Sequence, residues 1–155
     1  MDKNKKLDSA EAHRFFSAEC FNKTWSFIDR KKRTPREKNE MIATSFASLW
    51  HWMQRPDHTS ENFSVAYWQL SRVFSLAKEP FNALKYGKLC LASSKGKDIK
   101  PFYLAYAYEA LARAEMAAKN KKKMKEYRKK AEETAEKIQN SEYKSWVIAD
   151  LKTIK

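Results

Sequence analysis

Apolar residues recur at spacings of three and four through most of the chain, which is the period of a helix with one buried face. The stripe expected to be buried between residues 9 and 30 contains Phe15, Ala18, Phe21, Trp25 and Ile28, and it is widened by Phe16, Cys20 and Phe27. The next segment carries a stripe of Ile42, Phe46, Leu49 and Met53. We therefore expect two helices here, the first of them largely buried.

Capping residues and prolines mark where the predicted helices begin and end. Thr34-Pro35-Arg36-Glu37 supplies an N-cap hydroxyl, a proline in the first turn and a glutamate that reaches back to the cap. Arg55-Pro56-Asp57 ends the second helix, and Pro80 and Pro101 open later helices. The resulting prediction is three hairpins and a C-terminal capping helix, over about residues 9–54, 60–94, 101–139 and 141–153.

The composition supports an all-helical fold. Only two glycines and four prolines occur in 155 residues, whereas sheet proteins need many glycine-bearing turns. A chain of this length buries about 70% of its unfolded surface when it folds as one domain. We expect a single domain, residues 1–155, built as an all-α superhelix of about seven helices in antiparallel hairpins.

Two of the predicted hairpins share a pattern of large and small residues. The first contains Tyr67, Leu70-Ser71, Phe74, Ala83-Leu84, Tyr86 and Cys90-Leu91, and the second contains Tyr108, Leu111-Ala112, Met124, Tyr127 and Ala131. This arrangement resembles about two degenerate tetratricopeptide repeats, whose small residues let helices approach closely. The copies lie 41 residues apart (124 − 83) instead of the usual ~34, and Glu115 stands where an aromatic residue is expected.

The resemblance implies a protein that binds a peptide or partner protein in a concave groove lined by the first helix of each hairpin. Trp68 and Arg72 lie beside the first small-residue pair, and Tyr106, Glu109 and Arg113 lie beside the second. These five residues are the predicted groove, in which two guanidinium groups suit a carboxylate or a phosphate. Alternatively, Glu109 and Arg113 pair with each other four residues apart, while Arg72 packs on Trp68.

The formal charge of +13 raises a second hypothesis, binding to nucleic acid. The densest basic patch is KNKKKMKEYRKK, residues 119–130, with eight basic residues and one acidic residue, Glu126. Apolar residues keep one face of this segment, so the lysines are expected on a solvated face; the apolar residues are Met124, Tyr127, Ala131 and Ile138. We expect a protein or peptide partner, for which acidic groups would suit the two guanidinium groups, and we keep nucleic acid as the alternative.

Histidines and catalytic motifs give little support to a metal site or an enzyme. An antiparallel first hairpin brings His13 near His51, with His58 in the following loop, but no HxxxH or HExxH motif is present. We expect packing or capping histidines, no metal ion, and Trp50 and Trp52 flanking the hairpin contact. No GxSxG elbow or glycine-rich phosphate loop occurs, so we expect neither an enzyme nor a cofactor.

The sequence also bears on location. Its first ten residues, MDKNKKLDSA, are charged, and no stretch reaches the ~18 apolar residues of a membrane span. Cys20 and Cys90 each lie in an apolar helical run and are expected to be reduced. We expect a cytoplasmic protein that does not enter membranes. The sequence predicts neither its oligomeric state nor the identity of its partner.

Overall fold

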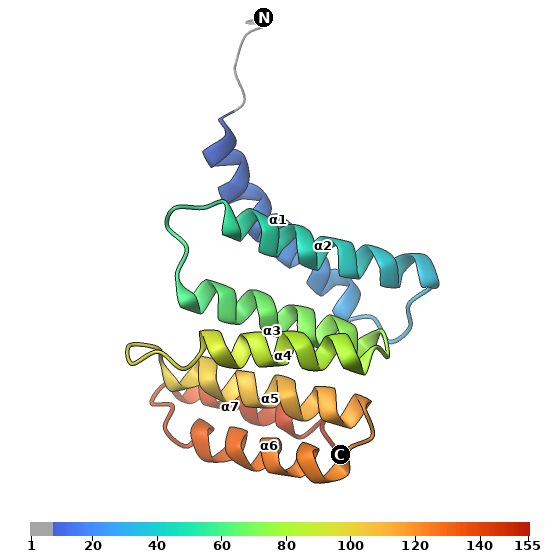
Figure 1. Ribbon diagram of the computed structural model, residues 1–155, viewed down its shortest axis with the longest axis vertical. Helices are drawn as coiled ribbons and strands as arrows, with labels where there is room; N and C mark the ends of the chain where they lie inside the picture. Colours follow the sequence, from blue (N-terminus) through green and yellow to red (C-terminus); the bar gives the residue numbers. More distant parts are fainter. Residues whose placement is uncertain (1–7) are drawn as a thin grey trace, which may run out of the picture. The chain divides into compact units, whose positions relative to one another are not determined.

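The computed structural model describes residues 8–155, and within this range it contains seven helices and no strand (Figure 1). This confirms the prediction of an all-helical chain in which neighbouring helices pack as hairpins. The helices are α1 (Ser9–Ile28), α2 (Pro35–Met53), α3 (Ser60–Leu76), α4 (Pro80–Ser93), α5 (Pro101–Ala117), α6 (Lys121–Ala135) and α7 (Ser141–Leu151).

The predicted caps set the helix starts. Thr34 Oγ1 accepts a hydrogen bond from the backbone N–H of Glu37 at 3.2 Å, and Glu37 Oε2 accepts one from Thr34 at 2.7 Å, which completes a capping box. One helix end differs from the prediction. α6 ends at Ala135 instead of near Gln139, because Ile138 N donates to the carbonyl oxygen only three residues back and tightens the chain into a turn.

Contacts divide the chain into two compact units, one ending at His58 and one comprising Thr59–Lys155. The single domain remains a prediction.

In the first unit, α1 and α2 pack through small polar residues. Ser17, Thr24 and Ser48 are buried between the two helices. Ser48 Oγ donates to the carbonyl oxygen of Ser17 at 2.7 Å, and Thr24 Oγ1 donates to Thr44 Oγ1 at 2.9 Å. Small side chains let two helices approach closely, and these hydrogen bonds satisfy the hydroxyl groups that the contact removes from water.

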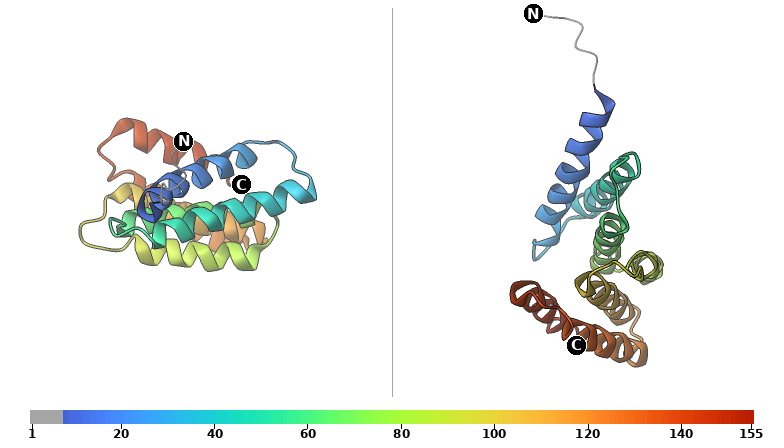
Figure 2. Two further views of the ribbon diagram at one scale, coloured as in Figure 1. Left: turned by 90° about the horizontal axis from the view of Figure 1, so that it is seen from above. Right: turned by 90° about the vertical axis from the view of Figure 1, so that its left-hand side faces the viewer.

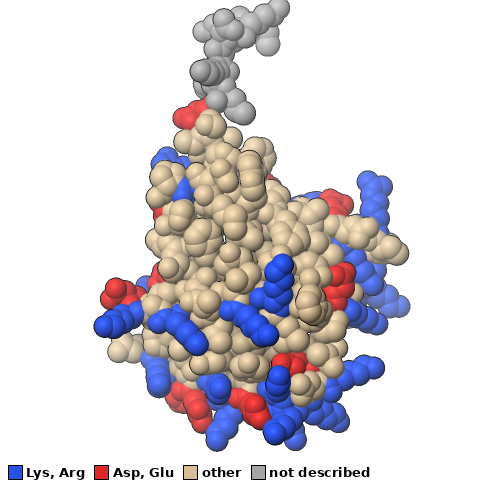
Figure 3. All heavy atoms as spheres, viewed as in Figure 1, with Lys and Arg blue, Asp and Glu red and all other residues tan. Residues whose placement is uncertain are grey.

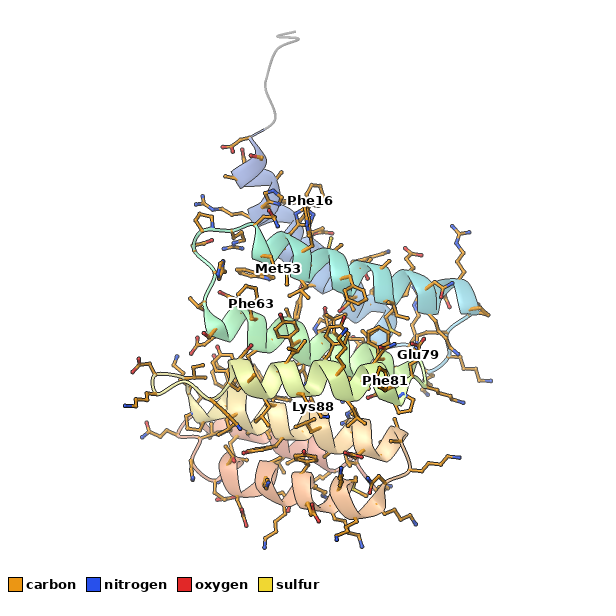
Figure 4. The ribbon with its side chains drawn as sticks, viewed as in Figure 1. Phe16, Met53, Phe63, Glu79, Phe81 and Lys88 are labelled. Atoms are coloured by element: carbon orange, nitrogen blue, oxygen red, sulfur yellow. The ribbon has the colours of Figure 1, made fainter. Side chains whose placement is uncertain are left out.

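The predicted apolar stripes of this unit are therefore wrong in part. Phe15 is 59% exposed, and Phe46 and Met53 are 37% and 45% exposed. Trp50 is 53% exposed but does flank the hairpin contact as expected, because its ring lies 5.2 Å from that of His13 in α1. Phe27, Ile28 and Leu49 are buried as predicted, so only part of each stripe is interior. Phe16 and Met53, labelled in Figure 4, belong to the exposed part.

In the second unit, α5 is the central helix and contacts α3, α4, α6 and α7. α3 pairs with α4 and α5 pairs with α6 as hairpins. Figure 2 shows α4 and α7 on opposite sides of α5. The helices α3, α5 and α7 follow one another as neighbours, and the predicted groove residues all lie on the first two of them.

The two hairpins of this unit have equivalent turns, 41 residues apart (119 − 78). Lys78 and Lys119 each adopt a positive φ, of 64° and 60°. In both turns the residue after the lysine donates its N–H to the carbonyl oxygen five residues earlier, at 2.9 Å. Non-glycine residues adopt this conformation rarely, so its recurrence at the same position marks the two hairpins as copies of one local structure.

Aromatic stacking repeats with the same period. Tyr67 stacks on Tyr86 with ring centroids 6.3 Å apart and an interplanar angle of 23°. Tyr108 stacks on Tyr127, 41 residues further on, at 6.4 Å and 25°. Large rings thus fill the same space within both hairpins. The equivalence is internal to this chain, and membership of the tetratricopeptide family stays a prediction.

Two further features of the described residues concern the cysteines and the length of the apolar stretches. Both cysteines are free, with Cys90 buried and Cys20 half-buried. Within residues 8–155, no helix is both long enough and apolar enough to cross a membrane.

Candidate functional site

All five predicted groove residues meet around one carboxylate, that of Glu109. Trp68 Nε1 donates to Glu109 Oε2 at 2.8 Å. The guanidinium groups of Arg72 and Arg113 both donate to Glu109 Oε1, at 3.3 Å and 2.7 Å. Tyr106 packs edge-on against Trp68 with ring centroids 5.2 Å apart. The structure therefore brings together two rings, two cations and one acid from α3 and α5.

Most of this cluster is interior. Glu109 is fully buried, and the side chain of Arg113 is 9% exposed. The Arg72 side chain keeps 15% exposure. A buried charge is stable only when it is paired and hydrogen-bonded, and Glu109 has three donors for its two oxygens. The predicted alternative, an ion pair between Glu109 and Arg113, is confirmed, and both residues act as structural partners.

The acid expected from a ligand comes here from the chain itself, through Asp150 of α7. Tyr106 donates its hydroxyl hydrogen to Asp150 Oδ2 at 3.0 Å, and Arg72 Nη2 lies 3.6 Å from Asp150 Oδ1. Arg113 Nη2 donates to the backbone carbonyl of Asp150 at 3.1 Å and to Thr153 Oγ1 at 2.8 Å. These contacts connect α7 to both other helices.

The surroundings shift two pKa values in this cluster. Burial, followed by the positive charge of Arg113, lowers the pKa of Arg72, while Glu109 and Asp150 oppose that change. Burial and the neighbouring carboxylate of Asp150 raise the pKa of Tyr106. Tyr106 therefore keeps its proton at neutral pH and remains the donor to Asp150.

Sequence reasoning missed Asp150, although the period contained the signal. Trp68, Glu109 and Asp150 are spaced by 41 residues each (109 − 68 and 150 − 109), so they occupy equivalent positions on α3, α5 and α7. The separation of 37 residues between Arg72 and Glu109 recurs between Arg113 and Asp150. α7 therefore occupies the position that the first helix of a third hairpin would have. Its Asp150 accepts a hydrogen bond from Arg113 of α5, as Glu109 accepts one from Arg72 of α3.

A row of aromatic side chains crosses the same three helices and is called here the aromatic strip. It consists of Trp68, Tyr106, Phe102, Tyr143 and Trp146, and each ring contacts the next, with centroids 5.0–5.2 Å apart. Trp68 is buried at one end of the strip. Tyr143 and Trp146 are 39% and 47% exposed at the other end. Sequence reasoning placed only Trp68 and Tyr106 at the site.

The chain matches no known protein family, no curated protein and no solved structure.

The lysine-rich segment forms a solvated helix face, as predicted. Met124 and Ala131 are buried, while Lys122, Lys125 and Lys129 are exposed. Figure 3 shows Lys and Arg side chains gathered over the part of the second unit that contains α6. Lys129 lies 3.7 Å from Glu133, a distance that gives only a weak surface pair. This face of α6 therefore presents positive charge to solvent.

Metal-ligating residues are sparse. Among the residues that the structure describes, no group of three or more His, Cys, Asp or Glu is placed to hold a metal ion. The predicted approach of His13 and His51 is nevertheless confirmed, because their Nδ1 atoms lie 2.8 Å apart. His58 instead lies against its own loop, with Nδ1 2.6 Å from the carbonyl oxygen of Arg55.

Proposed function

We propose that this chain is a non-enzymatic helical-repeat protein that binds a protein or peptide partner on the face formed by α3, α5 and α7. One observation carries the proposal: the aromatic strip is anchored in the interior at Trp68 and ends in the exposed rings of Tyr143 and Trp146. Aromatic rings that are held rigidly and are partly exposed are the usual anchors of protein interfaces.

The buried cluster supports the proposal as a positioning device. Arg72, Glu109 and Arg113 connect three helices through hydrogen bonds, so the rings above them are held by helix packing and not by loops. Tyr106, a member of the strip, and Arg72 both retain part of their exposure. An apolar or aromatic side chain of a partner fits the exposed rings of Tyr143 and Trp146.

The experiment is selection of binding peptides from a displayed random library, followed by affinity measurement on variants. We expect Trp146→Ala and Tyr143→Ala to weaken the selected peptides at least tenfold. Phe81→Ala is the matched control, because Phe81 is an aromatic residue 82% exposed on α4 and points into solvent (Figure 4). Equal binding by all three variants would remove the aromatic strip as the site.

Nucleic-acid binding is the second candidate, supported by the exposed lysines of α6. Binding through phosphates falls steeply with salt because it releases counterions. We expect Lys122→Glu, Lys125→Glu and Lys129→Glu together to abolish retention of single-stranded RNA in a filter assay at low salt. Retention that survives high salt, or survives the triple substitution, would contradict a phosphate-driven mode.

The proposal also includes a cytoplasmic location. Two free cysteines support it, since disulfides form and persist mainly outside the cytosol. Imaging of the fluorescently tagged chain tests this part separately from the binding experiments.

A further inference from the structure

Two imidazoles meet at the open end of the first unit. His13 lies in the second turn of α1 and His51 in the last turn of α2, so the antiparallel hairpin places them side by side. Their Nδ1 atoms are 2.8 Å apart, and their ring centroids are 5.0 Å apart with an interplanar angle of 52°. Both side chains are half-buried and therefore reachable from solvent.

This contact fixes the protonation of the pair. At 2.8 Å one Nδ1 carries a hydrogen and the other presents its lone pair, so the two rings are not both protonated on Nδ1. Burial, and then the charge of His13, lowers the pKa of His51. Neutral imidazole is the form that binds metal ions.

The two nitrogens are close enough to bind one metal ion together after a small movement of the rings. Two nitrogens that each lie ~2.0–2.1 Å from a shared ion are at most ~4 Å apart, and the observed separation is 2.8 Å. Among divalent ions, copper and nickel suit imidazole ligands, and Cu²⁺ binds most tightly in the series.

We propose that His13 and His51 form a two-histidine site for a divalent copper- or nickel-type ion, with both Nδ1 atoms as ligands. The ring that now donates from Nδ1 carries its hydrogen on Nε2 instead, exchanged through solvent, and the rings turn so that both lone pairs face the ion. No further His, Cys, Asp or Glu of the described chain completes a three-residue group, so the other coordination positions belong to water.

Aromatic rings surround the pair and supply a readout. Trp50 lies 5.2 Å from His13 and 4.9 Å from His51, measured between ring centroids. Phe16 is a further ring beside the pair, with its centroid 5.4 Å from that of His51. Cu²⁺ quenches the fluorescence of a nearby indole, so an ion held by the two histidines lowers the emission of Trp50.

The test uses the untagged full chain, titrated with NiCl₂ and CuCl₂ by calorimetry, with MgCl₂ as the metal that imidazoles bind poorly. We expect one ion per chain with micromolar affinity and a higher melting temperature. His13→Phe keeps an aromatic ring beside Trp50 without a ligand nitrogen, and it is expected to weaken binding at least tenfold. His51→Ala is expected to do the same. Circular dichroism confirms that each variant remains folded.

His58→Ala is the matched control, because the chain has three histidines and this one lies outside the pair. We expect it to bind Ni²⁺ within twofold of the unsubstituted chain. We also expect Trp50→Phe to remove most of the Cu²⁺-dependent quenching while leaving affinity unchanged. Affinity lost equally in His58→Ala and His13→Phe, or no binding below millimolar Ni²⁺, would overturn the site.

Discussion

The guanidinium group of Arg113 in α5 donates a hydrogen bond to the backbone carbonyl oxygen of Asp150 in α7, at 3.1 Å. Arg72 makes the corresponding hydrogen bond to Glu109, which is also 37 positions further along the chain. In this case the acceptor is the side-chain carboxylate and not the backbone. Each arginine thus ties its own helix to the next one in the row. The repeated contact is what keeps α3, α5 and α7 in one register beneath the aromatic strip.

The first prediction concerns the buried carboxylate. Replacing Glu109 with Gln leaves two guanidinium groups buried without their shared acid, and breaking a buried ion pair costs ~3–5 kcal/mol of unfolding free energy. Urea unfolding measures this loss. Glu133→Gln is the control, because its pair with Lys129 is exposed and the change is expected to be ~1 kcal/mol or less. Equal effects of the two substitutions would show that the cluster does not hold the helices.

The second prediction concerns Gly87, where helix α4 lies close to α5 and α3. A Cβ atom at this position meets Leu111 Cδ2 at 2.9 Å and Ser71 Oγ at 3.3 Å. Overpacking a core costs ~1–3 kcal/mol, and the higher helix propensity of alanine offsets part of it. Gly87→Ala should therefore lower the unfolding free energy by ~1 kcal/mol. Gly96→Ala, in the exposed α4–α5 loop, should change it by less than ~0.5 kcal/mol.

The third prediction concerns the first unit. Ser48→Leu removes the hydrogen bond to Ser17 and forces a large side chain into the α1–α2 contact, so hydrogen exchange of both helices should accelerate. Phe15→Ser should leave exchange nearly unchanged, because Phe15 is 59% exposed. The opposite ranking is what the apolar stripe of the sequence predicts. Amide exchange followed by mass spectrometry distinguishes the two.

The fourth prediction concerns the thiol of Cys90. Burial raises the pKa of this thiol to about 12. Its contribution to stability is therefore fully present below the pKa of the unfolded thiol and is lost as the pH rises toward 12. Iodoacetamide at pH 8 should label Cys20 in the native chain and Cys90 only in urea. In Cys90→Ala the unfolding free energy should fall less steeply with alkaline pH than in the unsubstituted chain.

The local signals of the sequence predicted the helices well. Thr34 and Glu37 form the capping box that their spacing indicated, and the prolines at 80 and 101 open helices. Caps and prolines act through the backbone of the few residues beside them, so no knowledge of tertiary contacts is needed to interpret them.

The buried faces were harder to predict, because burial depends on what lies opposite. Ser48 and Thr24 are buried at the α1–α2 contact, where they hydrogen-bond to Ser17 and Thr44, respectively, while Phe15 and Phe46 of the predicted stripes are exposed. A hydrophobicity pattern gives no weight to hydroxyl groups that find partners on another helix. Serine at a helical spacing therefore looks solvated until the facing helix is known.

The candidate site was found by residue type and misjudged in exposure. The sequence indicated that Trp68, Arg72 and Glu109 share one face, and they do meet. It did not show that α7 supplies Asp150 to the same place, because Asp150 and its partner Tyr106 are 44 positions apart in the sequence. The 41-residue period predicts the position of Asp150, but the period is recognised only when the turns at Lys78 and Lys119 are known to be equivalent.

The five tryptophans of the chain offer the most direct measurement of the central claim, that a partner binds at the exposed end of the aromatic strip. Each gives one indole N–H signal in a nitrogen–proton NMR spectrum, and a selected peptide is added to saturation. The signal of Trp146 is predicted to shift strongly, while those of Trp25, Trp50 and Trp52 stay in place. A Trp146 signal that does not move when the peptide is fully bound would contradict the account.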